Sequence, residues 1–272
     1  MKKIACLLLL VLSTFAFSSC SEYNKVLKSS DPDYKFTKAV EYYEDSRCYQ
    51  ALPLFEELIA SVRGTQRAEE AYYYFAKTHY CVKDYYIANY YLKNFVKTFP
   101  TSQYAEECLF ESAMCSYNLS PIYSLDQTDT RIAIDEFQLF IDRYPNSQLR
   151  DSCNRMVDQL RQKLERKSFE VAKLYVTTER YRSASSALEN ALKEYPDTPY
   201  REEILYLMVE ANYLYAEGSI DEKKIARYME TIDSYYKFVA NFPGSKMLKK
   251  AETYFIEAEK EIERLKKAGY EL

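Results

Sequence analysis

The side chains that most often do chemistry are scarce in this chain. Its 272 residues include one histidine, His79, and seven cysteines, none of which forms a CxxC pair. There is no GxSxG elbow, no HExxH helix and no glycine-rich phosphate loop. Carboxylates are plentiful, but neighbours such as Glu56 and Glu57 fall in helical segments, where they are typical of solvated faces. We therefore expect no enzyme, no catalytic residue, no metal site and no cofactor.

Five of the cysteines lie in the body of the chain. Two of them, Cys108 and Cys115, stand two helical turns apart, or about 10 Å, which is too far for a disulfide within one helix. With a single histidine beside them, a zinc site is not expected either. We interpret all five as buried small apolar residues: Cys48, Cys81, Cys108, Cys115 and Cys153.

Cys20 has a different setting from the other cysteines. Two lysines precede an apolar stretch at residues 4–12, and two serines stand directly before Cys20. This is the three-part layout of a secretory signal, and its apolar segment is shorter than the roughly 20 residues of a membrane span. Two interpretations remain: an ordinary signal peptide that is cut near Ser18, or cleavage directly before Cys20.

The small residues before Cys20 resemble the lipobox of bacterial lipoproteins, although Phe17 stands where leucine is commoner. The resemblance implies that residues 1–19 are a lipoprotein signal peptide and that Cys20 carries a covalent lipid at the start of a tether, residues 20–32. Several acyl chains on one cysteine give lasting membrane attachment. Because Ser21 rather than aspartate follows the cysteine, the same resemblance implies the outer membrane.

Four short phrases punctuate the rest of the chain. Each joins an aromatic residue and a proline to a nearby serine or threonine: FPTS at 99, YPNS at 144, YPDT at 195 and FPGS at 242. Proline cannot continue a helix, and serine or threonine can cap the next one. Since the apolar pattern between the phrases is helical, each phrase predicts the end of one helix and the start of another.

Small residues recur with two fixed spacings. One set of alanines repeats every 37 residues: Ala39, Ala76 and Ala113. A step of twelve residues then joins Ala76 to Ala88, and Ala88 to Pro100. These are the offsets of a tetratricopeptide repeat, in which small residues let two helices cross closely. The sequence thus predicts an all-α tetratricopeptide-repeat solenoid of about five helical hairpins, closed by a capping helix that starts near residue 246.

Aromatic residues mark one face of the first helix in three successive hairpins. They come in pairs seven residues apart, which places each pair on one side of a helix: Phe36 and Tyr43, Tyr73 and Tyr80, and Phe110 and Tyr117. The functional hypothesis is a groove for an extended or unfolded protein segment, with Lys77 placed to meet a carboxylate of that partner. The alternative is that these rings pack between helices.

The lipobox, the tether that runs into DYKFTKAVEYYEDSRCYQALPLFEELI, and five repeats together resemble the BamD family of the outer-membrane β-barrel assembly machinery. The resemblance implies a lipoprotein on the periplasmic face of the outer membrane. Residues 33–145, the first three repeats, would hold unfolded outer-membrane protein clients. Residues 146–272, the last two repeats and the capping helix, would dock onto a BamA-like barrel protein and other subunits of the complex.

Two further interpretations concern the partners. The formal net charge is −4, so no nucleic-acid partner is expected, because such partners favour a basic surface. The alternative to barrel assembly is a lipid-anchored repeat scaffold in another envelope or cell-wall assembly, without an unfolded client.

Overall fold

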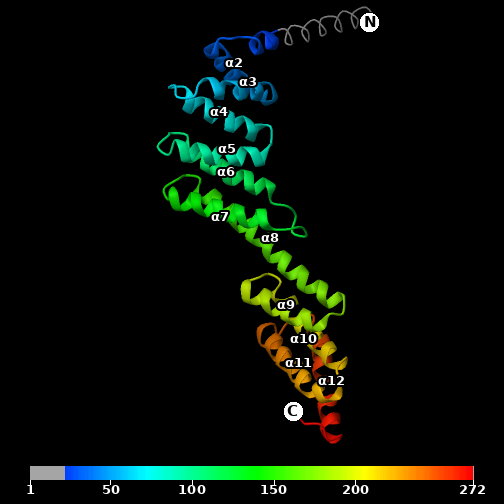
Figure 1. Cartoon of the computed structure of the whole chain (residues 1–272). Helices are drawn as coiled ribbons and strands as arrows, with labels where there is room; N and C mark the ends of the chain where they lie inside the picture. Colours follow the sequence, from blue (N-terminus) through cyan, green and yellow to red (C-terminus); the bar gives the residue numbers. More distant parts are fainter. Residues whose placement is uncertain (1–21, 272) are drawn as a thin grey trace, which may run out of the picture. The chain divides into compact units, whose positions relative to one another are not determined.

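The protein is described from a computed structural model that covers residues 22–271 and is built of α-helices (Figure 1). A short helical segment at residues 22–27 precedes the longer helices. These are α2 (Pro32–Glu44), α3 (Cys48–Ser61), α4 (Ala68–Cys81), α5 (Tyr85–Thr98), α6 (Ala105–Leu119), α7 (Thr128–Arg143), α8 (Arg150–Thr177), α9 (Tyr181–Glu194), α10 (Arg201–Glu217), α11 (Asp221–Asn241) and α12 (Leu248–Lys267).

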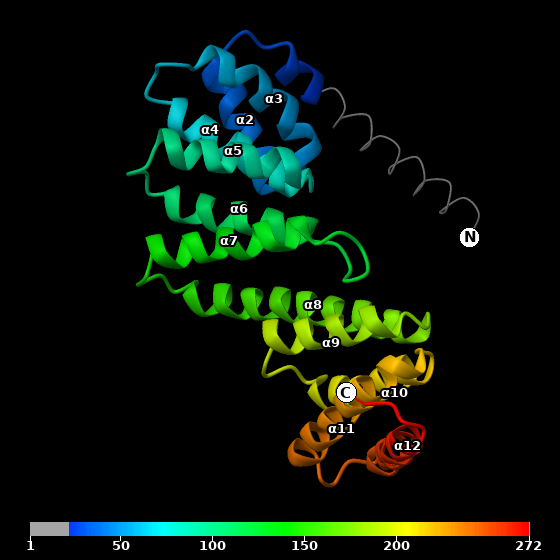
Figure 2. The same ribbon diagram turned by 60° about the horizontal axis from the view of Figure 1, so that its bottom comes forward.

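Successive helices pair as hairpins, from α2 with α3 to α10 with α11, and α12 follows as a single closing helix (Figure 2). Within residues 22–271 there is no β-strand. The prediction of an all-α tetratricopeptide-repeat solenoid with five hairpins and a C-terminal capping helix is therefore confirmed.

The small residues stand where the helices cross. The alanines that set the two repeat spacings are all fully buried: Ala39, Ala51, Ala76, Ala88, Ala113, Ala133 and Ala184. In the fifth hairpin, Val209 and Thr231 occupy the corresponding positions and are also fully buried. Close crossing leaves no room for larger side chains beside the helix axes, and this explains why these positions repeat so strictly.

Three hairpins share one tight turn between their two helices. Its central residue adopts a left-handed backbone conformation, with φ of 61° at Ser46, 64° at Lys83 and 58° at Glu179. Each turn spans only three residues between one helix and the next. The hairpins are therefore closed by the same backbone geometry, although none of the three residues is glycine.

The four aromatic–proline phrases make turns: three join successive hairpins, and the fourth joins α11 to the closing helix α12. In each one the serine or threonine oxygen accepts a hydrogen bond from the backbone N–H two residues later, as Ser102 does from Tyr104 (3.1 Å) and Thr198 from Tyr200 (3.2 Å). The next helix begins only after that residue. The hydroxyl therefore shapes the turn ahead of the helix and does not cap the helix itself.

By its internal contacts the chain divides into two units inside α8, one up to Leu160 and one from Arg161 onward. The sequence places its own division earlier, between residues 145 and 146. In the first unit, aromatic and aliphatic side chains from α2 to the start of α8 form two buried clusters, and the half-buried Tyr74 and Tyr91 pack against both. Phe55, Phe95, Phe137 and Phe140 are fully buried there and fill the space beside the helix crossings.

The second unit has its own core. Phe169, Leu188 and Phe238 are buried together at its centre. The capping helix α12 contributes one buried stripe to this unit, formed by Ala251, Ala258, Ile262 and Leu265. The opposite side of α12 is charged and exposed, as the end of a helical array requires.

Candidate functional site

Phe36 and Tyr73, two of the aromatic residues predicted to line a groove, are buried. Phe36 is 5% exposed, and the Arg67 guanidinium lies 5.0 Å from the centre of its ring. Tyr73 is 8% exposed and stacks on Tyr104, with ring centres 4.0 Å apart. For these two residues the structure agrees with the alternative of packing between helices.

Lys77 is also buried, at 8% exposed, and it is already paired within the chain. Its Nζ lies 2.7 Å from Glu107 Oε1 and forms a second ion pair with Glu111. The Tyr73 hydroxyl donates to the other oxygen of Glu107 at 2.9 Å. A partner carboxylate would therefore have to displace two carboxylates of α6.

Burial and the neighbouring charges shift the pKa values of this cluster in different directions. Burial alone would lower the pKa of the Lys77 ammonium, but the adjacent Glu111 and Glu107 outweigh it and raise that pKa. Burial raises the pKa of Glu111, even though Lys77 acts against it. For Glu107, hydrogen bonds from Lys77 and Tyr73 overcome the effect of burial, and the pKa is lowered. The cluster joins the second hairpin to the third, which is a structural role.

The second unit has an ion pair at the repeat positions that correspond to Lys77 and Glu107. Lys173 directly follows the repeat alanine Ala172, as Lys77 follows Ala76. The Lys173 Nζ lies 2.7 Å from Glu203 Oε1. Both partners of this second pair are about 40% exposed, so water screens it far more than the Lys77 cluster.

The remaining four groove residues, Tyr43, Tyr80, Phe110 and Tyr117, are half-buried. Tyr80 packs edge-on against Tyr85, with ring centres 5.7 Å apart. Burial raises its pKa to about 12, so the hydroxyl remains a hydrogen-bond donor at neutral pH. Tyr117 donates to Gln159 Oε1 at 2.6 Å. Each of these rings keeps part of its surface in water, which leaves the groove hypothesis standing for them as a prediction.

An apolar cavity in the first unit was not identified from the sequence. It has a volume of about 630 Å³ and lies where the end of α3, the start of α4 and the end of α5 meet. Ile59, Tyr72 and Phe99 are the largest apolar residues of its wall. Phe99 opens the first of the four proline phrases, so a pattern that marks a turn in the sequence also places a ring in a cavity wall.

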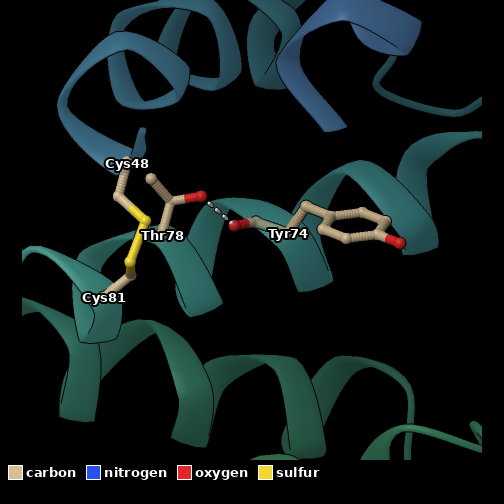
Figure 3. Close-up of a disulfide and its surroundings, with 4 residues drawn as sticks. All are labelled: Cys48, Tyr74, Thr78 and Cys81. Carbon is tan, nitrogen blue, oxygen red and sulfur yellow. Dashed lines mark hydrogen bonds between the residues drawn. A yellow bond between two sulfur atoms is a disulfide. The ribbon is translucent and has the colours of Figure 1, made fainter. Parts of the chain in front are cut away.

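Cys48 and Cys81 correct the interpretation of the cysteines. They form a disulfide with a Cα–Cα distance of 6.1 Å (Figure 3). The spacing of Cys108 and Cys115 excludes a disulfide within one helix, but it does not address bonds between helices. However, α3 and α4 are successive antiparallel helices, so the first residue of α3 meets the last residue of α4. The repeat pattern could have predicted this disulfide, because it indicates which helix ends are neighbours.

The other three body cysteines match the prediction: Cys108, Cys115 and Cys153 are free and buried. Burial raises the pKa of all three thiols, that of Cys153 to about 11. Because the thiolate is the reactive form, these cysteines are unreactive at neutral pH.

Cys20, the predicted lipid attachment site, lies outside the described residues. Across residues 22–271, no group of histidine, cysteine, aspartate and glutamate side chains is arranged to hold a metal ion. Among the same residues, no helix combines the length and apolar character needed to cross a bilayer.

Two characterised relatives align with most of the chain. One is the outer membrane protein assembly factor BamD of Pasteurella multocida, 20% identical over 221 residues, which cover 78% of this chain and 85% of that protein. The other is the outer membrane protein assembly factor BamD of Haemophilus influenzae, 24% identical, with 78% and 84% covered.

Solved structures of repeat proteins are more distant. A thermophilic TPR protein of Thermus thermophilus, TTC0263, is 17% identical, with a TM-score of 0.34, over 83% of this chain and 100% of that chain. The TPR2AB domain of yeast Sti1 is 13% identical, with a TM-score of 0.38, over 84% and 98%. Similarity at this level says nothing about the partners of this chain.

A family match covers most of the described residues. Residues 29–226, which run from the tether through the first helix of the fifth hairpin and into α11, match the YfiO family of outer membrane lipoproteins. The match therefore spans both units and the repeat architecture that the structure shows. The chain belongs to this outer membrane lipoprotein family.

Proposed function

We propose that this protein is a lipid-anchored, non-catalytic subunit of the machinery that assembles β-barrel proteins in the outer membrane. The observation that carries the proposal is the family match over residues 29–226. It is joined by two relatives named as assembly factors, each of which aligns with this chain over more than four fifths of its own length. In this role the protein binds unfolded outer-membrane protein segments and a BamA-like barrel subunit. Cys20 carries the lipid and holds the repeats at the periplasmic face.

The client side of the proposal rests on the first unit. Tyr43, Tyr80, Phe110 and Tyr117 offer partly wet aromatic surface on the first helices of three hairpins. Tyrosine suits such a surface, because its ring buries apolar area while its hydroxyl stays hydrated. An unfolded client loses conformational entropy on binding, so we expect modest affinity and ready release. Lys77 is reassigned here from client contact to joining two hairpins.

The partner side rests on the second unit, residues 161–272, which has a core of its own. A separate core allows this part to keep its shape while clients come and go on the first unit. Charged side chains between Arg201 and Lys250 are the proposed contacts with the barrel subunit.

Co-purification from solubilised membranes tests the proposal. A tagged full chain should bring down a BamA-like barrel protein in a stoichiometric complex. Recovery of peptidoglycan enzymes or a secretin instead, with no barrel protein, would replace the proposal by an envelope scaffold. The groove is tested separately, by peptides that correspond to the last strand of a barrel protein.

A further inference from the structure

A polar hollow of about 420 Å³ lies in the second unit, between α9, α10 and α11. Most of its wall consists of side chains that donate hydrogen bonds: Arg182, Ser185, Ser186, Lys223 and Arg227. Asn212 and Tyr215 of α10 complete the wall with Glu230, the one carboxylate among its described residues. Neither the repeat pattern nor the proposed assembly role assigns any function to this hollow.

Among the residues that the structure describes, no carboxylate pairs with the cations of the hollow. Within residues 22–271, neither Arg182 nor Lys223 forms an ion pair, whereas the adjacent Lys224 pairs with Asp221 at 3.2 Å. The Arg227 guanidinium lies 4.0 Å from the centre of the Tyr215 ring. It also donates to the Ser219 hydroxyl. Arg227 is thus held in place by neutral groups, and its charge remains available to a ligand.

The charge and the donors of the hollow fit one class of anion best. Three cationic side chains face one carboxylate, which leaves two positive charges in excess. A phosphomonoester carries about −1.5 to −2 charges at neutral pH and three acceptor oxygens. A single carboxylate offers one charge and two oxygens, too few for two guanidinium groups, an ammonium and a hydroxyl.

Asn212 of α10 is a buried residue beside the hollow. This residue is 5% exposed, and its Nδ2 donates to Ser234 Oγ at 2.8 Å. Its Oδ1 is buried and receives no hydrogen bond from the described residues. A buried amide oxygen without a donor is costly, but this oxygen has almost no accessible surface, so the ligand is recognised by the charged and hydroxyl side chains of the wall.

We propose that this hollow binds a phosphomonoester, such as glycerol phosphate. Arg182, Lys223, Arg227 and Ser185 hold the phosphoryl oxygens, whereas the Ser186 hydroxyl donates to the Arg182 carbonyl oxygen at 3.3 Å. The same group can arrive as a soluble ester or as the headgroup of an anionic lipid in the membrane to which the protein is anchored. The site does not depend on the assembly role.

Calorimetric titration with sn-glycerol 3-phosphate tests the site, with the full chain held in phosphatidylcholine nanodiscs. The Arg182→Gln/Lys223→Gln variant should lose at least tenfold in affinity. Both side chains are exposed and unpaired, so the fold should survive their replacement. The matched control is Lys193→Gln/Lys246→Gln, which removes the same charge from exposed lysines of the same unit outside the hollow.

Retained affinity in the control together with loss in the Arg182→Gln/Lys223→Gln variant supports the site. Equal loss in both variants would show unspecific attraction to charge and overturn it. Absence of binding to the unmodified chain, or tighter binding of an acidic peptide than of glycerol phosphate, would overturn it as well.

A second arm identifies the source of the ligand. When phosphatidic acid replaces part of the phosphatidylcholine, a lipid headgroup in the hollow should weaken the apparent affinity for glycerol 3-phosphate. An unchanged affinity assigns the site to a soluble ester. Either result keeps the phosphoryl site.

Discussion

Cys48, the first residue of α3, is covalently bonded to Cys81, the last residue of α4, across a sequence separation of 33 residues. Cys48 is buried, whereas Cys81 is exposed. In Figure 3 the bond lies beside Thr78, whose hydroxyl donates to the Tyr74 carbonyl oxygen at 2.6 Å, and the Tyr74 ring points away from the sulfurs. The bond joins the first hairpin to the second in the unit proposed to hold clients.

Reduction of this disulfide should destabilise the first unit. Closing a loop of this length stabilises the folded state by about 4 kcal/mol, mainly by restricting the unfolded chain. We expect Cys48→Ser/Cys81→Ser, or a reducing agent, to lower the free energy of unfolding by that amount in a denaturant titration. The double variant should no longer respond to the reducing agent. Superimposable unfolding curves for the oxidised and reduced protein would contradict the prediction.

The Lys77 cluster should respond asymmetrically to substitution. Lys77→Met leaves Glu107 and Glu111 without their cation, and loss of one partner of a buried ion pair costs about 3–5 kcal/mol. Adding Glu111→Leu should recover part of that loss, because it removes the more deeply buried carboxylate. Urea denaturation measures both variants.

The control for this comparison is Lys237→Met, which breaks an exposed pair with Asp233 at 3.9 Å. It should change stability by less than about 0.5 kcal/mol. A loss in Lys77→Met no larger than in this control would show that the cluster contributes nothing.

His79 should make the protein less stable in mild acid. Its ring packs against Phe75 and Tyr91, and within the described residues neither nitrogen has a hydrogen-bond partner. Burial lowers its pKa, against the weaker pull of Asp84 and Glu56. Below the ordinary histidine pKa of about 6.5, the unfolded chain therefore binds a proton that the folded chain resists. Stability from this group is full above that pH and falls as the pH decreases.

The chain has a single histidine, which makes the measurement direct. Its NMR titration should give a pKa below 6.5. The free energy of unfolding should fall more steeply between about pH 7 and pH 5 in the natural protein than in His79→Phe. Burial raises the pKa of Glu111, which acts in the opposite direction, but it contributes equally to both proteins. Parallel pH profiles would refute the assignment.

The aromatic groove is tested by Tyr80→Ala/Tyr117→Ala. These tyrosines occupy the same repeat position in neighbouring hairpins, and both are partly exposed. The variant should bind a peptide from the last strand of a barrel protein at least fivefold more weakly, since an aromatic contact is worth about 1 kcal/mol or more. Fluorescence anisotropy measures this, and the melting temperature reports on the fold.

Tyr86→Ala/Tyr90→Ala is the matched control for the groove variant. Both of these tyrosines are more than half exposed on α5, and neither belongs to the predicted groove. Their removal should leave peptide binding unchanged. If the two variants bind equally, the hypothesis of a groove on the first helices fails.

The lipid anchor predicts a change in location without a change in fold. Cys20→Ala should release the protein from the membrane pellet into the soluble fraction, because the predicted acyl chains are its attachment. Its far-UV circular dichroism and melting temperature should match those of the anchored protein. Continued sedimentation of the Cys20→Ala variant with membranes would count against lipidation at this residue.

The fold could be predicted because one constraint acts at many positions. Ala39, Ala76 and Ala113 must be small for the same reason, so the sequence repeats the signal and their burial follows. The final helix was predicted on similar grounds, since an exposed array end requires one apolar stripe and one polar face.

The site was less predictable because its features depend on single partners. Tyr73 and Tyr80 share a helix face, and the pattern treats them alike. In the structure Tyr104 covers Tyr73, and Tyr80 stays half-buried. Periodicity indicates which side of a helix a residue occupies, but it does not indicate which rings a later segment of the chain covers. For the same reason the carboxylates that hold Lys77 were not identified from the sequence.

The ion pairs Lys77–Glu107 and Lys173–Glu203 give the array a direction. In each pair the basic member belongs to one hairpin and the acidic member to the hairpin that follows. A duplicated hairpin would thus present its lysine to the glutamate of the next hairpin. A substitution that reverses the charge at one of the two positions would preserve the ion pair only if the charge at the other position were reversed as well. These paired positions should co-vary among natural homologues, and they give a rule for lengthening such a protein by inserting repeats.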